Sequence, residues 1–229
     1  MKNLIYSTPF SGSTNKSMLM NEDVNPWDIR YANAQYVYGT EPNQFFKHNI
    51  DMFLPGKILL PAEGEGRNAV YAAQQGWMVD AMDSSIQARH KALYLAEKKN
   101  VSITYQLGTL LELQYPLNSF DCIALIFAHF EPEHRSTYHQ KLTQLLKPGG
   151  TLILEAFGTK HPANQEKNPQ VGGPTQPEFL ISPQNLQVDF SLMDIVYLKE
   201  EQIELSEGLL HQGTGSIVRM IAKKPRKNP

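Results

Sequence analysis

Short apolar runs alternate with helix-like stretches between residues 57 and 157, and this alternation constrains the fold more than any other feature of the chain. The runs lie at 58–60, 77–83, 101–106, 120–128 and 151–157, and helices are expected at 42–53, 67–75, 86–99, 132–146 and about 183–190. Strands of a parallel sheet are covered on both faces and so appear as near-continuous apolar segments. The pattern therefore predicts an α/β domain with a mostly parallel sheet and helices on both faces.

The C-terminal part of the chain departs from this alternation. Two more strands are expected at 195–205 and 216–222, joined by 206–215 with no helix between them, so they must pair as an antiparallel hairpin. Before them, residues 158–178 carry Pro162, Pro169, Pro174, Pro177 and the pair Gly172-Gly173. We expect this segment to be a long loop insertion, and loops of that length tend to be functional lids or disordered.

Composition excludes several classes of protein. The 229 residues are 41% hydrophobic, enough for one folded domain, and 21 Lys and Arg face 23 Asp and Glu. This balance argues against a nucleic-acid partner or an anionic membrane partner, because both need a broad basic face. The longest apolar run, 122–128, is far too short to span a membrane. Residues 1–25 lack the pattern of a signal peptide, so we expect a disordered tail there and a cytoplasmic protein.

Metal and disulfide chemistry are also disfavoured. The single cysteine, Cys122, lies inside an apolar run, which excludes an internal disulfide and any site built from several cysteines. His129, His134 and His139 recur every five residues. That spacing turns each by about 140° around a helix, so the three cannot share a metal ion. We expect no metal site.

The glycine turn Gly64-Glu65-Gly66 lies between the first strand and a helix, where a ligand can approach the backbone closely. Asp83 closes the second strand, and a carboxylate there can accept hydrogen bonds from both hydroxyls of a ribose. Together they predict a cofactor that contains a nucleoside. The spacing Gly64-x-Gly66-x-x-Ala69 also fits the nicotinamide-dinucleotide fingerprint, and a turn that is only structural is the simpler alternative.

Two groups of segments resemble known enzymes. Residues 146–154 (Leu-Lys-Pro-Gly-Gly-Thr-Leu-Ile-Leu) and the closing hairpin resemble the class I S-adenosylmethionine-dependent methyltransferases. The segments 27–31, 36–43, 62–69 and 207–213, in that order, look like the bacterial tellurite-resistance and thiopurine methyltransferase-like group. The resemblance implies a Rossmann-like sheet of seven strands in the order 3-2-1-4-5-7-6 within a single domain at 26–225, with S-adenosylmethionine as cofactor. It also implies methyl transfer to a small-molecule acceptor, for which a thiol and a metalloid oxyanion are candidates.

The chain departs from that family in two places. The usual first turn, Asp-Leu-Gly-x-Gly-x-Gly, is Leu-Pro-Ala-Glu-Gly-Glu-Gly at 60–66. Its acidic residue is absent, so Glu63 or Glu65 is expected to bind the methionine amino group instead. After the third strand, Thr109 stands where many relatives carry Asp or Asn near the adenine. Its hydroxyl can still accept a hydrogen bond from the adenine amino group, but more weakly than a carboxylate.

The expected site residues follow from the resemblance and from the topology. Residues 26–53 form a lid segment on which Arg30 can bind a carboxylate, although a packed Trp27 beside a solvated Arg30 is the simpler alternative. His129 is the candidate base, and a hydrogen-bonded histidine that closes a strand end is the alternative. The substrate is expected to meet Glu155, Phe157, Glu207 and His211. The expected cofactor-binding residues are Trp27, Arg30, Tyr38, Glu63, Gly64, Glu65, Gly66, Asn68, Asp83, Ser84, Thr109, Leu110 and Phe127.

Two other functions stay open at this stage. The nicotinamide fingerprint allows an NAD(P)-dependent oxidoreductase, and the altered first turn with Thr109 allows a nucleoside-binding protein without catalytic activity.

Overall fold

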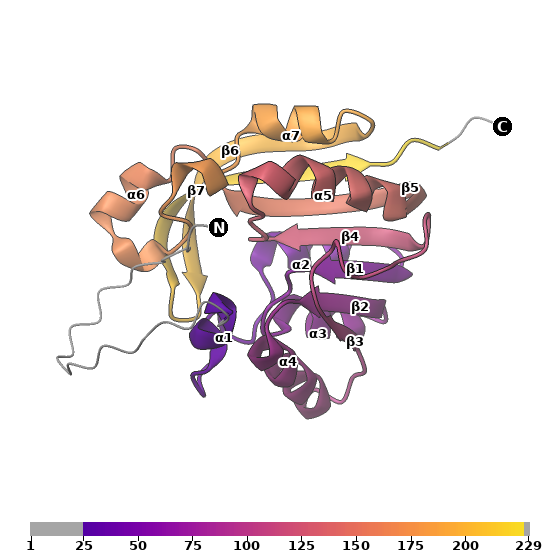
Figure 1. Ribbon diagram of the computed structural model, residues 1–229, viewed down its shortest axis with the longest axis horizontal. Coiled ribbons are helices and arrows are strands. Elements are labelled where there is room, and N and C mark those ends of the chain that lie inside the picture. The colour runs from indigo at the N-terminus through magenta and orange to yellow at the C-terminus, as the bar shows by residue number, and fades with distance from the viewer. Residues whose placement is uncertain (1–24, 227–229) are drawn as a thin grey trace.

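A seven-stranded sheet in the order β3-β2-β1-β4-β5-β7-β6 forms the centre of the computed structural model, which describes residues 25–226. Figure 1 shows the strands stacked in this order, with β3 at the bottom and β6 at the top. The strands are β1 (Lys57–Pro61), β2 (Met78–Asp83), β3 (Thr104–Leu107), β4 (Phe120–Ile126), β5 (Leu146–Phe157), β6 (Asp194–Glu207) and β7 (His211–Lys223). The predicted strand order is confirmed.

Strand direction also agrees with the prediction. The pairs β1–β2, β1–β4, β2–β3 and β4–β5 are parallel, whereas β7 is antiparallel to both β5 and β6. β6 therefore runs in the same direction as β5, and the β6–β7 hairpin loop lies at the edge where the parallel strands end. Ligands of open α/β sheets bind at this carboxyl edge.

Helices cover both faces of the sheet. The helices are α1 (Pro26–Tyr31), α2 (Gln44–Ile50), α3 (Arg67–Gln74), α4 (Ile86–Lys98), α5 (Pro132–Leu145), α6 (Pro162–Lys167) and α7 (Pro183–Asp189). Alternate residues of β1 reach opposite faces: Leu59 packs with Leu142 of α5 and Leu186 of α7, and Leu60 packs with residues of α2, α3 and α4.

Helix α4 shows how the local sequence sets the elements beside the site. The Ser85 hydroxyl accepts a hydrogen bond from the backbone N–H of Ala88 at 3.1 Å, which satisfies one of the donors that a helix start leaves unpaired. The cap comes two residues after Asp83, so α4 begins next to the carboxyl end of β2.

Three predictions of local structure are corrected. Residues 158–178 contain α6 and two short 3₁₀ helices, Pro169–Val171 and Pro177–Phe179, because their prolines occupy first helical turns rather than interrupting a helix. The helix expected at 42–53 is shorter (α2). The connection expected at 206–215 is mostly strand, since β6 and β7 stay paired as far as Glu207 and His211.

The N-terminal expectation lies mainly outside the described residues. Residues 1–24 and 227–229 are not described, and Asn25 belongs to the folded part as the N-cap of α1. Within 25–226, no helix has both the length and the apolar character that are needed to cross a membrane.

Candidate functional site

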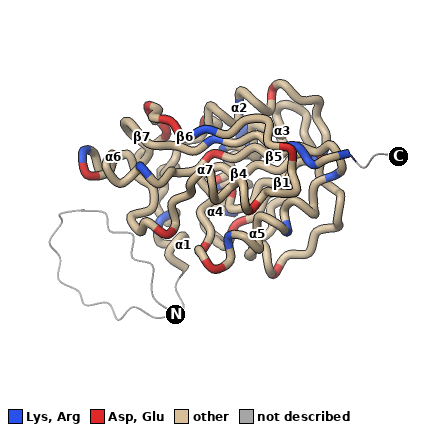
Figure 2. The backbone as a smooth tube through the Cα atoms, turned by 90° about the horizontal axis from the view of Figure 1, so that it is seen from above, with Lys and Arg blue, Asp and Glu red and all other residues tan. Residues whose placement is uncertain are grey.

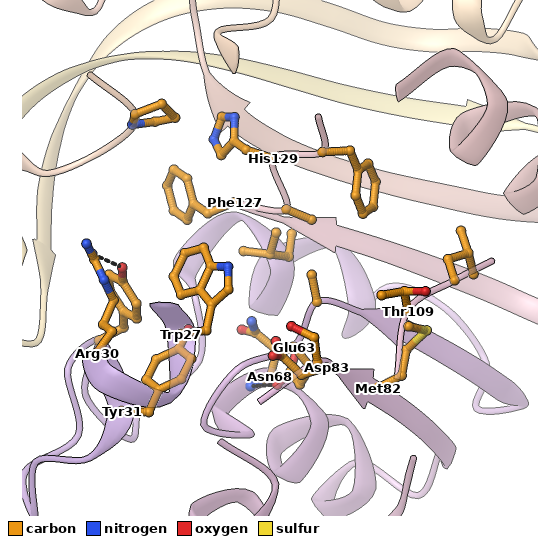
Figure 3. Close-up of a pocket in the computed structure, with 18 of the residues that line it drawn as sticks. Trp27, Arg30, Tyr31, Glu63, Asn68, Met82, Asp83, Thr109, Phe127 and His129 are labelled. Carbon is orange, nitrogen blue, oxygen red and sulfur yellow. Dashed lines mark hydrogen bonds between the residues drawn. The ribbon is translucent and has the colours of Figure 1, made fainter. Parts of the chain in front are cut away.

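A pocket opens at the carboxyl edge of β1, β2, β4 and β5, and α1 and the β6–β7 hairpin complete its walls (Figure 3). The residues that line it come from segments spread over nearly the whole described chain. They include Trp27, Arg30, Tyr31, Tyr38, Ala62, Glu63, Arg67, Asn68, Met82, Asp83, Ser84, Thr109, Leu110, Phe127, His129, Phe130, Phe157, Pro174 and His211.

Asp83 lies at the end of β2 on the pocket wall and is 7% exposed. One carboxylate oxygen accepts the backbone N–H of Gly64 at 3.0 Å, and the other accepts that of Ser85 at 2.9 Å. The two oxygens together can accept about four hydrogen bonds, and the backbone of Ser84 also interacts with the carboxylate, so part of its acceptor capacity remains. Burial raises the pKa of Asp83, while the hydrogen bonds from Ser85 and Gly64 work in the opposite direction. The backbone thus fixes the Asp83 carboxylate at the pocket wall, and its role as an acceptor for ribose hydroxyls stays a prediction.

Glu63 lies beside Asp83 (Figure 3), and its side chain caps the N-terminus of α3. Its Oε1 accepts the backbone N–H groups of Asn68 at 2.9 Å and Ala69 at 2.7 Å. The N-cap residue of α3 is Gly66, which has no side chain to do this. Burial raises the pKa of Glu63 to about 7 despite these bonds, so a cation that binds here would stabilise the ionised carboxylate.

Glu65 has a different use from the one that the sequence suggested. Its carboxylate accepts the backbone N–H of Val37 at 2.7 Å and pairs with Lys91 at 2.5 Å, and it does not line the pocket. Of the two glutamates proposed for the methionine amino group, only Glu63 is in place. Gly64 and Gly66 shape the turn: both have positive φ, and a side chain at Gly66 would lie within 2.5 Å of Ala92 in α4.

Ala62 has a φ of 51°, a left-handed conformation that suits glycine, and its side chain is exposed at the pocket. We expect Ala62→Gly to raise the free energy of unfolding by up to about 1 kcal/mol. Relief of roughly 1–2 kcal/mol of backbone strain outweighs the larger unfolded-state entropy of glycine, and no packed methyl group is lost. Urea unfolding of the two proteins measures this. A less stable variant would show that the turn carries no strain at this residue.

Thr109 and Leu110 form the wall that follows β3. The Thr109 hydroxyl donates to Glu112 at 2.9 Å, so its oxygen is left as an acceptor, as binding of an adenine amino group requires. Leu110, 2% exposed, adds an apolar surface.

Helix α1 is fixed against the start of α4 by polar contacts. The Asn25 side chain donates to the backbone oxygen of Ser84 at 2.8 Å, and Asp28 accepts the Ser85 hydroxyl at 2.6 Å. This docking brings Trp27 and Arg30 to the pocket, and Arg30 donates to the Tyr38 hydroxyl at 3.0 Å. Trp27 and Arg30 are thus half-buried and both line the pocket, and the binding of a carboxylate by Arg30 stays a prediction.

His129 is held by backbone groups at both ring nitrogens. Its Nδ1 lies 2.9 Å from the carbonyl oxygen of Phe179, and its Nε2 accepts the N–H of Phe157 at 3.4 Å. Burial lowers the pKa of His129 to about 4, so the ring is neutral. This geometry gives His129 the structural role of a histidine that closes a strand end, and leaves it no free lone pair for a substrate proton.

Phe127 bends the chain at the end of β4. Its φ is 54°, a costly conformation for a bulky residue, and such strain is found most often at functional sites. The ring packs at 4.8 Å from that of Phe157 and at 4.5 Å from that of His211, measured between centroids. These rings form an aromatic compartment next to Trp27 and Tyr38 in the pocket lining.

The four residues expected at the substrate divide between two cavities. Phe157 and His211 line the main pocket, whereas Glu155 and Glu207 line a second cavity, which shares Tyr38 and Arg67 with the first. Glu155 pairs with Arg219 at 2.6 Å, and Glu207 pairs with Arg67 at 2.9 Å. Asn43 donates to both glutamates, at 2.6 and 2.8 Å. Sequence reasoning missed Arg67, Asn43 and Arg219, because their partners lie far away in the chain and no local spacing reveals them.

The main pocket fits the expected cofactor. Asp83 offers free acceptor positions for a ribose, Glu63 offers a carboxylate for an amino group, and Thr109 with Leu110 offers a polar and an apolar surface for a base.

Comparison with known proteins shows a similarity in the first four strands of the sheet. Residues 58–150 match the family model described as a methyltransferase domain. This segment of the chain is similar to a methyltransferase domain. The matched segment runs from β1 to the start of β5 and contains Glu63, Asp83 and Thr109. No curated protein sequence matches the chain.

Solved structures support the same fold. A structure titled "Conversion of a Disulfide Bond into a Thioacetal Group during Echinomycin Biosynthesis" matches this chain with a TM-score of 0.71 and 16% identity, over 88% of this chain and 91% of that one. TehB from Haemophilus influenzae matches with a TM-score of 0.65 and 17% identity, over 80% and 62%. A structure from Methanosarcina mazei, described as a SAM-dependent methyltransferase, matches with a TM-score of 0.60 and 18% identity, over 82% and 100%. The family match and the fold together support an enzyme of the methyltransferase type that uses S-adenosylmethionine as cofactor.

Proposed function

We propose that this methyltransferase transfers the methyl group of S-adenosylmethionine to a small-molecule acceptor that enters the aromatic compartment. The observation that carries the proposal is the division of the main pocket. Asp83, Glu63 and Thr109 offer polar groups for a nucleoside and an amino group, and Phe127, Phe157 and His211 enclose the adjoining space. A space with ring walls suits a small ligand rather than a polymer.

The cofactor supplies a methyl group that is already activated by a positively charged sulfur. The protein therefore has to hold the acceptor in line with that group, and alignment of this kind provides most of the rate enhancement. The aromatic side chains in the lining, Trp27, Tyr38, Phe127 and Phe157, restrict the acceptor and exclude water.

A thiol and a metalloid oxyanion are the acceptors that the sequence resemblance favours. The fold similarity to TehB agrees with this choice, although fold alone does not fix a substrate. A nucleic-acid partner is not part of the proposal. Figure 2 shows basic and acidic residues interspersed along the described chain, and the charge of the whole sequence is nearly balanced, whereas such a partner needs a broad basic face.

Calorimetric titration with S-adenosylmethionine, S-adenosylhomocysteine, NADH and NADPH tests the proposal. We expect binding of the first two only. Binding of a nicotinamide cofactor instead would favour an oxidoreductase. Tight binding of S-adenosylmethionine with no turnover on a panel of thiols, phenols, amines, selenite and tellurite would favour the nucleoside-binding alternative.

The same titration at two pH values tests the role of Glu63. Because its pKa is raised to about 7, the carboxylate is mostly protonated at pH 6 and mostly ionised at pH 7.5. Affinity for S-adenosylmethionine should therefore rise by about five- to tenfold between these values, since the ionised form attracts the amino group. Glu63→Gln should remove this dependence. Glu65→Gln, in the same turn, should keep it, and equal behaviour of the two variants would contradict the assignment.

A further inference from the structure

Glu207 and His211 face each other across the β6–β7 hairpin as the last register pair of the two strands. The Nδ1 atom of His211 lies 3.1 Å from Oε2 of Glu207. Arg67 donates to the same oxygen at 2.9 Å, and Asn43 donates to Oε1 at 2.8 Å. Burial favours a raised pKa for Glu207, but the hydrogen bond from His211 and the charge of Arg67 outweigh it and lower the pKa to about 2. Glu207 is thus ionised and only accepts hydrogen bonds.

An ionised partner fixes the tautomer of the imidazole. Nδ1 must carry the proton that it donates to Glu207, so Nε2 keeps its lone pair. Among the described residues, no group forms a hydrogen bond with Nε2. Nε2 is also not one of the polar side-chain atoms that are both fully buried and unpaired. Since His211 lines the main pocket, Nε2 is the atom of the ring that is left for a ligand.

The other histidines near this pocket differ in that respect. His129 uses both ring nitrogens on backbone groups. His161 does the same, with Nε2 at 2.9 Å from the Gly172 carbonyl and Nδ1 accepting the N–H of Ser216 at 3.3 Å. His211 alone of these three combines a carboxylate on one nitrogen with a free lone pair on the other, the arrangement typical of a general base.

We propose that His211, oriented by Glu207, is the general base of the methyl transfer and that the acceptor presents its nucleophilic atom as an O–H, S–H or N–H group. The proposal rests on the proposed function and narrows its acceptor class. As the nucleophilic atom bonds to the methyl carbon, its proton passes to Nε2 of His211. The methyl–sulfur bond breaks and leaves its electron pair on the sulfur, and the imidazolium then returns the proton to water.

The groups around His211 set the protonation state that this step requires. Burial lowers its pKa, Glu207 on β6 works in the opposite direction, and Arg67 on α3 and His161 beside α6 lower it further. His129, after β4, also faces His211. The centroid of the Tyr38 ring lies 4.5 Å from that of His211. The ring is therefore neutral near pH 7, as a base must be before it takes a proton.

The walls of the compartment favour flat acceptors. The rings of Tyr38, Phe127 and Phe157 lie 4.5, 4.5 and 5.3 Å from His211, centroid to centroid. Aromatic ligands stack or pack edge-on against such rings. Phenols and aromatic thiols fit the inference, whereas tellurite and selenite, which already carry negative oxygen, need no base.

Nitrogen NMR of the ¹⁵N-histidine-labelled protein tests the tautomer without any turnover. At pH 7.5 we expect the His211 signals of a neutral ring protonated at Nδ1, assigned by their loss in His211→Asn. In Glu207→Ala we expect the two tautomers to mix. A ring that is protonated at Nε2 in the native protein would overturn the proposal, because that nitrogen could not accept a proton.

Turnover provides the second test, with catechol, benzenethiol, benzylamine, selenite and tellurite as acceptors. His211→Asn should lower turnover on the O–H, S–H or N–H acceptor that is methylated by about 100-fold or more and leave S-adenosylmethionine affinity within about twofold. Glu207→Gln should shift the acid limb of the rate–pH profile. His134→Asn, which changes an exposed histidine on α5, is the control and should keep full activity.

The outcomes separate the two proposals. Methylation of selenite or tellurite alone, at equal rates in the native protein and in His211→Asn, would overturn the role of His211 while the proposed function stands. Failure to bind S-adenosylmethionine would instead contradict the proposed function, and the NMR result would still decide whether Nε2 can accept a proton.

Discussion

Asp189→Ala is expected to lower the free energy of unfolding by about 3–5 kcal/mol, because it removes the shared partner of three side chains. The carboxylate, at the end of α7, accepts Nδ1–H of buried His139 at 2.9 Å and the hydroxyl of Ser136, and it pairs with Arg135 at 3.2 Å. All three partners lie on α5. The Asp189 side chain is only 3% exposed, so its loss leaves a buried imidazole N–H and a charge without a partner.

Urea unfolding at pH 7 measures this effect, and Asp194→Ala, an exposed aspartate at the start of β6, is the matched control. We expect the control to stay within about 0.5 kcal/mol of the native protein, as is usual for surface substitutions. A loss below about 1 kcal/mol in Asp189→Ala would mean that α7 is held by apolar packing alone.

The pH dependence of stability provides a second test of the contacts of Asp189. Burial favours a raised pKa for Asp189, but the hydrogen bonds from His139 and Ser136 outweigh it and lower the pKa to about 2. A carboxylate with a lowered pKa stabilises the folded state above its unfolded pKa, about 4, and loses that contribution as the pH falls toward 2. The native protein should lose about 2 kcal/mol over this range from Asp189, and Asp189→Ala should lack this part of the slope.

Asp83→Ala is expected to weaken S-adenosylmethionine binding by about 1–3 kcal/mol, or roughly 5- to 150-fold in dissociation constant. The substitution removes the acceptors proposed for the ribose hydroxyls. It also leaves the backbone N–H groups of Gly64 and Ser85 without their partner, so the turn loses its support. Asp83→Asn keeps one acceptor oxygen and should lie between the native protein and Asp83→Ala.

Calorimetric titration measures the affinities, and Asp80→Asn is the matched control. Asp80 is a buried carboxylate on the same strand, but it pairs with Lys57 at 2.8 Å and does not line the pocket. We expect Asp80→Asn to lower stability and leave cofactor affinity unchanged. If Asp83→Ala binds S-adenosylmethionine as tightly as the native protein, Asp83 is not part of the cofactor site.

The sequence predicted the sheet well because parallel strands buried on both faces leave a strong apolar signal. Asp83 and the glycine turn could be placed from the same signal, since both lie directly at strand ends. Residue type alone could not show which of the nearby carboxylates lines the pocket. Glu63 and Glu65 are two residues apart and chemically alike, yet one lines the pocket and the other pairs with Lys91.

The sequence also could not show which histidine is free to act as a base. His129 follows a central strand and looked like a catalytic candidate, but its two nitrogens bind the backbone of Phe179 and Phe157, which follow it by 50 and 28 residues. Whether a histidine has a free lone pair depends on contacts of this kind, and the sequence does not record them. His211 was expected near the substrate, but its pairing with Glu207 emerges only from the hairpin register.

The register of the β6–β7 hairpin has a consequence for how this chain can vary. Glu207 and His211 are joined by a loop of three residues, Gly208, Leu209 and Leu210, and Gly208 packs so closely on the backbone of Val37 and Tyr38 that any side chain there would collide. Side chains alternate between the two faces of a strand, so inserting one residue into either strand near the loop would turn one member of the pair to the opposite face. The hairpin loop, although it lies at the surface, should therefore tolerate changes of length far less than most loops of this protein.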